Sequence, residues 1–538
     1  MALTSSPTPS QRPRRSPRAG RGPLGWLVRH NPRLRRRDES GYVMAMAALC
    51  LIPLMVVAAF SIDFGSFYTD ASKLQRVAES ASLAGVVWMP DLTTATTVAE
   101  AAAASNGISQ GSRYDVVVSS MPGNIHQLKV TIVDKKAPQY LSKSFKGSVA
   151  ITRSAVAQYE QPIPMGSPQN YFGTGNLNSG SVPKENLWAA VNGYCSAHEN
   201  GDLRLAGFEN AFRGSGRYDC STINGTIVNP DYQATGYLYV VRIPSVAPSS
   251  VPIQIYDASY VGGNGRDLSL TSGHGVNTTF QLLDHAGAPY NPYSHTVLST
   301  LTVNSGDNYY NGQWRTVATI NNPVAGADYY LQVFTQAGQA NSAGSNGFGL
   351  RTTSPSGTFS ACTTDPTAST PPYSTGCVRI FPYQEMSVYV NDNSTTASFH
   401  LAEIDATYAG KFINIGLFDP GEGAKDIQVL DPNGNPVSFT WSTLCTNPPS
   451  PPSGGCSGGP STKLAVSGTG SQPYSRLSSN SKYNDRTMTL RIGLPSNYAA
   501  VYGSKTWWKI KYTTNSSNVT DRTTWTVGVE GSPVHLVD

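Results

Sequence analysis

The chain has 538 residues, of which 14% are charged, and it carries 51 glycines, 37 prolines and 28 tyrosines. The charged fraction is well below the roughly 25% of ordinary globular proteins. The net charge of +5 comes from residues 1–37, which hold ten arginines and no acidic residue; removing those ten charges leaves −5 for the rest. This balance argues against a nucleic-acid-binding body and fits an exported, turn-rich β protein.

Residues 43–62 form an apolar run of twenty residues without a charge. At about 1.5 Å per helical residue the run spans roughly 30 Å, the thickness of a bilayer core. Arginines beside a span stay on the cytoplasmic side. We therefore expect a single-pass protein of the cell membrane, with a cytoplasmic N-terminal tail that touches anionic lipid and an extracellular C-terminal bulk. A cleaved signal peptide has a shorter apolar region of about 7–15 residues, so we favour a retained anchor and keep cleavage as the alternative.

A helix is predicted to continue out of the membrane over residues 61–85, because Leu74, Val77, Ala78 and Ala81 recur at helical spacing. Small residues concentrate at its end and would let another helix approach closely. They are Ala78, Ser80, Ala81, Ser82, Ala84 and Gly85.

The same stretch carries a recognisable pattern. Gly41 precedes the apolar run, residues 62–65 read I-D-F-G, residues 74–75 read L-Q, and residues 78–85 read A-E-S-A-S-L-A-G. This pattern resembles the TadG-like N-terminal region of tight-adherence (Tad/Flp) pilus-assembly proteins, which usually reads A-D-A-A-A-L-A-G at the last positions. Glu79 keeps the charge of the family's aspartate, and two serines replace alanines. The resemblance implies a membrane-anchored assembly component whose anchor helix contacts other pilus or envelope proteins.

A small α+β module is expected next. Residues 93–107 predict a helix that ends at Gly107. Residues 114–120, 126–134 and 148–160 alternate as strands. The Gly/Asn/Ser-rich residues 166–181 predict a linker or loop.

Beyond the linker the pattern is β throughout and duplicates itself approximately. Residues 236–259 parallel 397–421, and each stretch contains a strand that ends in an aromatic–Asp pair: Tyr256–Asp257 and Phe418–Asp419. Three further stretches of the first half also have counterparts in the second, and the last two strands of each half are predicted to form a hairpin. These stretches are residues 278–290 with 426–441, 327–336 with 505–514, and 346–353 with 523–531.

The predicted fold is an N-terminal transmembrane helix with a small α+β module, followed by two β-sandwich-like domains. The expected boundaries are a basic disordered cytoplasmic tail (1–40), the transmembrane and TadG-like helix (41–90), the α+β module (91–160), a linker (161–185), β-sandwich domain 1 (186–390) and β-sandwich domain 2 (391–538).

Six cysteines lie outside the apolar run, and an even number in an oxidising compartment suggests disulfides. We prefer pairing of sequence neighbours among the fifteen connectivities that six cysteines allow; the neighbours are Cys195 with Cys220, Cys362 with Cys377, and Cys445 with Cys456. Cys50 lies within the run as a small apolar residue.

Aspartates gather at predicted strand ends and have two interpretations. Calcium takes carboxylate and carbonyl oxygens at sandwich edges, whereas aspartate before glycine or proline favours turns. No D-x-D-x-D-G spacing supports calcium, so we expect no cofactor and keep calcium as an alternative. The residues are Asp257, Asp267, Asp284, Asp392, Asp405, Asp419 and Asp431.

No catalytic constellation is present at sequence level: His198–Glu199 is not followed by the second histidine of an H-E-x-x-H site, and no G-x-S-x-G elbow or phosphate loop occurs. We therefore predict no catalytic, cofactor-binding or metal residues and a non-enzymatic, surface-exposed structural component of Tad/Flp-type pilus assembly or adhesion. The alternative is a carbohydrate-binding adhesin without a pilus role, and an anchored hydrolase ranks below it. Aromatic side chains that either bind sugar or fill the core are Tyr309, Tyr310, Trp314, Trp507, Trp508 and Trp525.

Overall fold

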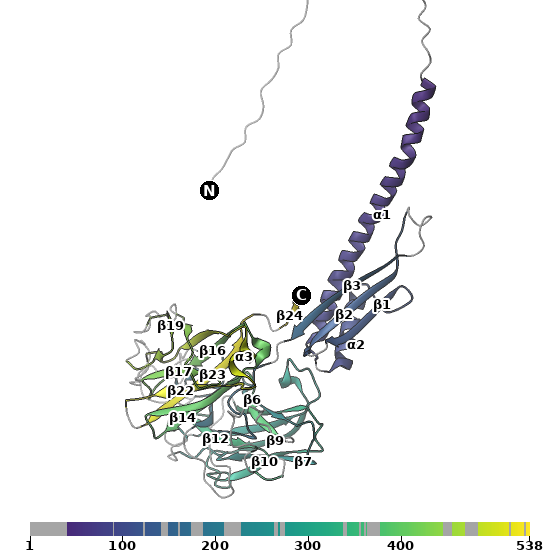
Figure 1. Cartoon of the computed structure of the whole chain (residues 1–538). Helices are drawn as coiled ribbons and strands as arrows, with labels where there is room; N and C mark the ends of the chain where they lie inside the picture. The colour runs from purple at the N-terminus through teal and green to yellow at the C-terminus, as the bar shows by residue number, and fades with distance from the viewer. Residues whose placement is uncertain are drawn as a thin grey trace, which may run out of the picture. The chain divides into compact units, whose positions relative to one another are not determined.

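The fold was analysed in a computed structural model of the whole chain (Figure 1). It divides into two compact units, one of residues 1–66 with 138–147 and one of residues 67–137 with 148–538. The described residues are 40–89, 91–121, 124–140, 149–159, 162–173, 187–208, 228–262, 267–268, 275–336, 342–354, 357–359, 362, 377–444, 455–468, 482–515, 518–531 and 534–537. The tail expected at residues 1–40 lies outside this part, apart from Ser40.

A single helix, α1 (Ser40–Val86), joins the apolar run to the Tad-like pattern without a break. Among the described residues it is the one helix long and apolar enough to cross a membrane, with a mean hydropathy of 2.6 in its most apolar window. Its apolar side chains over residues 42–62 are exposed, as a lipid-facing surface requires. The predicted membrane helix is therefore confirmed as an element of the fold.

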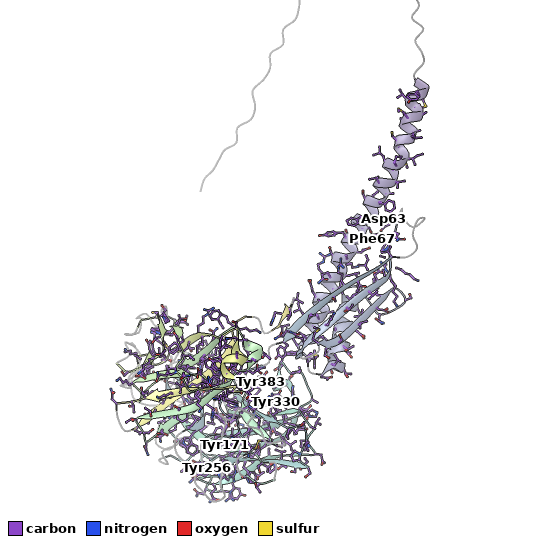
Figure 2. The ribbon with its side chains drawn as sticks, viewed as in Figure 1. Asp63, Phe67, Tyr171, Tyr256, Tyr330 and Tyr383 are labelled. Atoms are coloured by element: carbon purple, nitrogen blue, oxygen red, sulfur yellow. A yellow bond between two sulfur atoms is a disulfide. The ribbon has the colours of Figure 1, made fainter. Side chains whose placement is uncertain are left out.

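Asp63 marks the end of the apolar run and lies on α1 close to Phe67 (Figure 2). Its side chain is only 1% exposed. One carboxylate oxygen, Oδ1, accepts a hydrogen bond from the backbone N–H of Tyr140 at 2.9 Å. The backbone of the segment that follows β2 thus binds the Asp63 carboxylate at the end of the apolar run.

The small module combines the second half of α1 with α2 (Leu92–Ser105) and a sheet of order β1-β2-β3-β24. Its strands are β1 (Tyr114–Met121), β2 (Asn124–Ala137), β3 (Val149–Tyr159) and β24 (Val534–Val537). The predicted helix and three strands are confirmed. The fourth strand comes from the other end of the sequence and lies beside β3 (Figure 1).

The small residues of α1 are covered by this chain's own module. Ala78, Ala81, Ser82 and Gly85 are buried in the described structure, and α2 presents Ala95, Ala99 and Ala103 as its buried face. A Cβ on Gly85 would lie 2.7 Å from the carbonyl oxygen of Ala95. The close helix approach that the sequence predicted therefore takes place within the chain.

Replacing Gly85 by alanine should destabilise the module, because the new methyl group meets backbone that cannot move aside. Overpacking of this kind costs about 1–3 kcal/mol. Chemical denaturation of the full chain in detergent measures the loss. Gly65→Ala is the matched control on the same helix, since a Cβ there meets nothing within 4 Å; equal stability of both variants contradicts the packing described here.

Among the described residues the β body contains three sheets. The longest has the order β10-β7-β12-β5-β14-β23-β16-β21-β18-β19, with β4 beside β12. Its strands are β4 (Tyr171–Phe172), β5 (Leu187–Asn192), β7 (Ser250–Tyr256), β10 (Trp314–Asn321), β12 (Ser345–Arg351), β14 (Glu385–Asp392), β16 (Phe412–Phe418), β18 (Phe439–Ser442), β19 (Ser457–Ser461), β21 (Thr487–Gly493) and β23 (Val519–Val529).

Two shorter sheets complete the body. The five-stranded sheet has the order β13-β6-β11-β8-β9, and the four-stranded sheet has the order β15-β22-β17-β20. Their strands are β6 (Tyr237–Arg242), β8 (Thr278–Leu283), β9 (Val297–Val303), β11 (Asp328–Thr335), β13 (Arg379–Pro382), β15 (Thr396–Glu403), β17 (Asp426–Leu430), β20 (Leu464–Ala465) and β22 (Trp507–Thr513). Short helices are η2 (His198–Asn200), η3 (Pro292–Ser294), η4 (Ala406–Tyr408) and α3 (Tyr498–Tyr502).

The strand orders show that the body is an internal repeat. The order β10-β7-β12-β5 of the first half matches β21-β16-β23-β14 of the second, and β6-β11-β8 matches β15-β22-β17. Asp257 and Asp419, the residues after the predicted aromatic–Asp strands, both adopt left-handed backbone, with φ of 57° and 52°. The duplication inferred from the sequence therefore reappears in topology and in backbone conformation.

The two repeats join edge to edge. The equivalent strands β5 and β14 pair antiparallel, with Tyr389 opposite Trp188, so that one sheet runs through both repeats. One cluster of buried side chains likewise extends from Ile163 to Val527. The boundary expected at residue 390 falls inside β14.

The predicted hairpins are wrong. Strand β11 pairs with β6 and β8, whereas β12 pairs with β4, β5 and β7. In the second repeat β22 and β23 likewise enter different sheets. The physical reason is burial. All seven residues of β12 are buried, so this strand is covered on both faces and pairs in a different sheet from β11.

The expected linker is partly packed into the body. Its described residues, 162–173, include Met165, Asn170 and Phe172, which are fully or almost fully buried. Asn170 donates from Nδ2 to the carbonyl oxygen of Thr352 at 2.9 Å. The polar composition that resembled a linker therefore includes side chains that form hydrogen bonds with buried backbone groups.

One predicted disulfide is confirmed: Cys362 is bonded to Cys377. Cys195 and Cys456 are each disulfide-bonded as well. Their expected partners, Cys220 and Cys445, lie outside the described residues. Cys50 is a free, exposed cysteine on α1.

Candidate binding site

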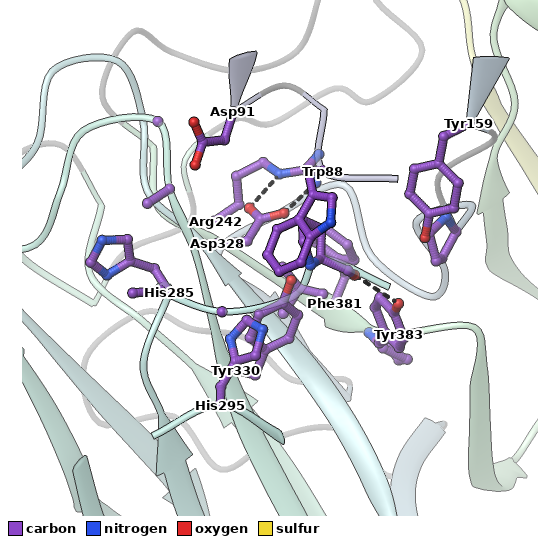
Figure 3. A pocket seen from close by; sticks show the side chains of 18 of the residues that line it. Trp88, Asp91, Tyr159, Arg242, His285, His295, Asp328, Tyr330, Phe381 and Tyr383 are labelled. Atoms are coloured by element: carbon purple, nitrogen blue, oxygen red, sulfur yellow. Dashed lines mark hydrogen bonds and ion pairs between the residues drawn. The ribbon is translucent and has the colours of Figure 1, made fainter. Parts of the chain in front are cut away.

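A cavity of about 560 Å³ opens beside the five-stranded sheet, within the second unit (Figure 3). The small module contributes Trp88, Asp91 and Tyr159, and strands β6, β11 and β13 contribute most of the opposite wall. Cavities of this size hold small ligands or a short chain segment. The side chains labelled in Figure 3 are Trp88, Asp91, Tyr159, Arg242, His285, His295, Asp328, Tyr330, Phe381 and Tyr383.

A bidentate ion pair forms the polar wall. Arg242 on β6 and Asp328 on β11 face each other in the strand register. Nε and Nη2 of the guanidinium donate to the two carboxylate oxygens, both at 2.8 Å. Burial would lower the pKa of Arg242, but the Asp328 carboxylate outweighs burial and the pKa lies above its ordinary value. Because both side chains keep about a third of their surface exposed, we treat the pair as a cavity wall rather than a deeply buried bridge.

Aromatic rings supply the other walls. Tyr330 and Tyr383 meet edge to face at 5.9 Å, and they lie near each other in Figure 2. Trp88 meets Tyr290 in the same manner at 5.8 Å. Burial raises the pKa of Tyr330 and of Tyr383 above their ordinary value, so both hydroxyls stay protonated near neutrality and keep a proton to donate.

The loop after β8 is fixed at the cavity by one histidine. His295 places Nδ1 2.8 Å from the carbonyl oxygen of Asp284 and Nε2 3.0 Å from that of Ala288. A Cβ on Gly287 would lie 2.4 Å from this ring, so the loop closes onto the histidine only with glycine at that position. The described lining thus offers aromatic faces with paired polar groups, an arrangement suited to binding.

The aspartates at strand ends accept hydrogen bonds from backbone N–H groups, some within a turn and some from distant segments. Asp257 Oδ1 accepts from the N–H of Gly312 at 2.6 Å, and Asp419 Oδ1 accepts from the N–H of Asp485 at 2.8 Å. Asp405 and Asp431 accept from backbone two residues ahead. Among the described residues no three histidine, cysteine, aspartate or glutamate side chains form a metal-ligating group. Asp284 and Asp392 make local contacts, whereas Asp267 accepts from the N–H groups of Val261 and of Gly347 on β12.

An acidic corner of the β body, formed mostly by the second repeat, was not predicted from the sequence. It consists of Glu199, Asp419, Glu422, Asp485 and Asp521, and the pKa values of Glu199, Asp419, Glu422 and Asp521 lie above their ordinary range. Burial comes first and neighbouring carboxylates second in raising the pKa of Asp521 and of Glu199 to about 8. These residues come from separate segments of the chain, so no local sequence pattern predicts the cluster.

For the three tryptophans of β22 and β23, the interpretation as buried side chains holds rather than the sugar-binding one. Trp507, Trp508 and Trp525 are buried. Trp508 and Trp525 belong to the sandwich core, and Trp507 packs beside His400 on the other face of β22. Trp314 and Tyr310 are half-buried, and Tyr309 is 59% exposed. Other aromatic rings line the cavity.

The geometry defines a class of protein: an apolar anchor helix that continues into a small α+β module, which is attached to a duplicated β body. Residues 41–105 match the family model Tad, Flp pilus-assembly TadE/G-like. The resemblance read from Gly41 to Gly85 is therefore confirmed, and the N-terminal region of the chain is a TadE/G-like region.

Two further comparisons add no function. No curated protein matches the chain. A crystal structure of tripeptidyl peptidase 2 (TPP II) aligns over 76% of this chain at 9% identity with a TM-score of 0.17, a value too low to carry an argument. The chain spans 29% of the length of that structure.

Proposed function

We propose that the chain is a membrane-anchored, non-enzymatic structural component of a Tad/Flp-type pilus assembly, with its β body outside the cell. The observation that carries the proposal is the TadE/G-like match over residues 41–105, in which one unbroken helix links the apolar span to the module. The anchor holds the chain in the membrane, and the β body with its disulfide presents binding surfaces to pilus or envelope partners. No cofactor takes part in this role.

Deletion of the gene should abolish or strongly reduce surface appendages and attachment. Full-length protein supplied in trans should restore both, whereas a variant that lacks the β body should restore neither. Electron microscopy and a surface-attachment assay measure the two outcomes. Normal piliation and attachment in the deletion strain would contradict the proposal.

The orientation makes a separate prediction. The ten arginines before the span favour a tail inside the cell, so an exposed residue of the β body should react from outside. Tyr309→Cys in a Cys50→Ser background is expected to be labelled by a membrane-impermeant maleimide in intact cells whose outer barrier is opened. Labelling that appears only after lysis of the inner membrane reverses the orientation.

A second candidate is a surface carbohydrate-binding adhesin without a pilus role. The cavity favours it, since aromatic faces beside the Arg242–Asp328 pair suit the apolar and hydroxyl faces of a sugar. Glycan-array binding that disappears in Trp88→Ala and persists in Tyr309→Ala, together with normal piliation in a deletion strain, would favour this candidate over the first.

A further inference from the structure

Strand β9 (Val297–Val303) is an edge of the five-stranded sheet, and within the described part of the chain it pairs with β8 alone. An edge strand presents a row of open backbone N–H and C=O groups to any other strand. The sequence of β9 is VLSTLTV, without a charge or a proline. It therefore lacks two of the usual devices that prevent edge-to-edge pairing.

The other described edges carry such devices. Strand β1 has the Asp115–Lys135 ion pair, β10 has Arg315 and an irregular register, and β13 ends at Pro382. Strand β15 is irregular between His400 and Ala402, and β19 contains Pro460. Strands β20 and β24 have only two and four residues. Strand β9 has a register shift at its start, which leaves residues 299–303 regular.

The edge is also exposed and partly apolar. Val297 and Leu298 keep 48% and 47% of their surface accessible, and the following residues up to Thr300 are exposed on both faces of the strand. Long, uncharged and accessible edge strands in natural sheets mark sites where another strand adds.

We propose that β9 is an interaction surface that pairs antiparallel with β9 of a second copy of this chain. In a pair related by a twofold axis, each strand faces an identical strand. Because β9 carries no charge, this pairing brings no like charges together. Pairing centred on Thr300 would set Thr300 opposite itself and Ser299 opposite Leu301. Cross-strand threonine pairs are favourable, and this molecule already uses one, Thr279 with Thr302 at 3.0 Å between hydroxyl oxygens.

The fold supplies a precedent for this junction. Its two repeats are joined by the antiparallel pair of equivalent edge strands β5 and β14, which is the arrangement that a second copy would repeat at β9. The proposal does not rest on the pilus role, although multiple copies of an anchored chain suit an assembly.

Cysteine cross-linking in membranes tests the proposal on the full chain. Thr300→Cys in a Cys50→Ser background should form a disulfide-linked dimer under mild oxidation, because residues opposite in an antiparallel pair have Cβ atoms about 4.5–5.5 Å apart. Thr319→Cys is the matched control, since Thr319 is an exposed threonine on the edge strand β10. Cross-linking of Thr300→Cys no greater than that of Thr319→Cys overturns the proposal.

A second variant separates β9 pairing from association through other parts of the chain. Thr300→Lys sets like charges opposite each other and should lower the dimer fraction by about fivefold, whereas Thr300→Ser should not. Circular dichroism checks that both variants fold. An unchanged dimer fraction in Thr300→Lys, or a cross-link from Thr300→Cys to a different protein, rejects the second copy as the occupant.

Discussion

Replacing Trp508 by alanine should lower the free energy of unfolding of the β body by about 3–5 kcal/mol, the usual cost of removing a buried aromatic side chain. The indole is 1% exposed. It packs against Tyr502 at 6.0 Å, and its Nε1–H donates to the Tyr498 hydroxyl at 2.9 Å. The variant therefore loses apolar burial and leaves a buried hydroxyl without its donor. Denaturant unfolding followed by near-ultraviolet circular dichroism measures the change.

The matched control is Tyr309→Ala, which removes an exposed ring from a loop of the first repeat. Its main packing partner is the Arg315 guanidinium, 4.0 Å above the ring, so the expected loss is below about 1 kcal/mol. If Trp508→Ala is as stable as Tyr309→Ala, the indole is not part of the core. The sequence alone could not separate the two residues, because alternation says that a side chain faces one side of a strand without saying which side is covered.

The repeat is the part of the β body that the sequence predicted best. The aromatic–Asp pairs at residues 256–257 and 418–419 are local signals: each aspartate needs a left-handed backbone and takes an N–H from a neighbouring loop. Aspartate tolerates that conformation better than most residues. Because both repeats have this local requirement, the same aromatic–Asp pair occurs in both, although the sequences of their strands differ.

Contacts between distant segments could not be predicted in the same way. Strand β24 joins the module sheet from about 375 residues beyond β3, and β11 and β12 enter different sheets although they are consecutive. The cavity collects Trp88, Arg242 and Tyr383 from three such segments. Periodicity identifies a strand. Which strands pair depends on which layers pack together and exclude water, and that packing depends on residues throughout the chain.

The repeat also exposes a difference between its halves. Tyr256 pairs with Gly349 in the first repeat, and Phe418 pairs with Thr524 in the second. Counting three residues back places Asn346 and Asp521 at equivalent positions. Asn346 is a neutral amide, whereas Asp521 accepts the N–H groups of Gly421 and Glu422 at 2.8 and 3.2 Å inside the acidic corner.

The β body should therefore lose stability as the pH rises. The pKa of Asp521 and of Glu199 is raised to about 8 in the folded chain, whereas exposed carboxyls in the unfolded chain titrate near 4. Between these values the folded state binds more protons, so the stabilisation is complete below about pH 4 and is lost progressively up to about pH 8. Each group contributes a slope of at most about 1.4 kcal/mol per pH unit.

Denaturant unfolding at a series of pH values from 4 to 9 tests this slope with a matched pair of variants. Asp521→Asn should flatten the fall in stability by up to one proton's slope, because the first repeat already accepts an amide at the equivalent position. Asn346→Asp should steepen the fall, since it places a buried carboxyl at the equivalent position of the first repeat, where an amide now stands. A profile that neither variant alters would mean that these carboxyls titrate alike in the folded and unfolded chain, and that the acidic corner is open to water rather than closed by the sandwich.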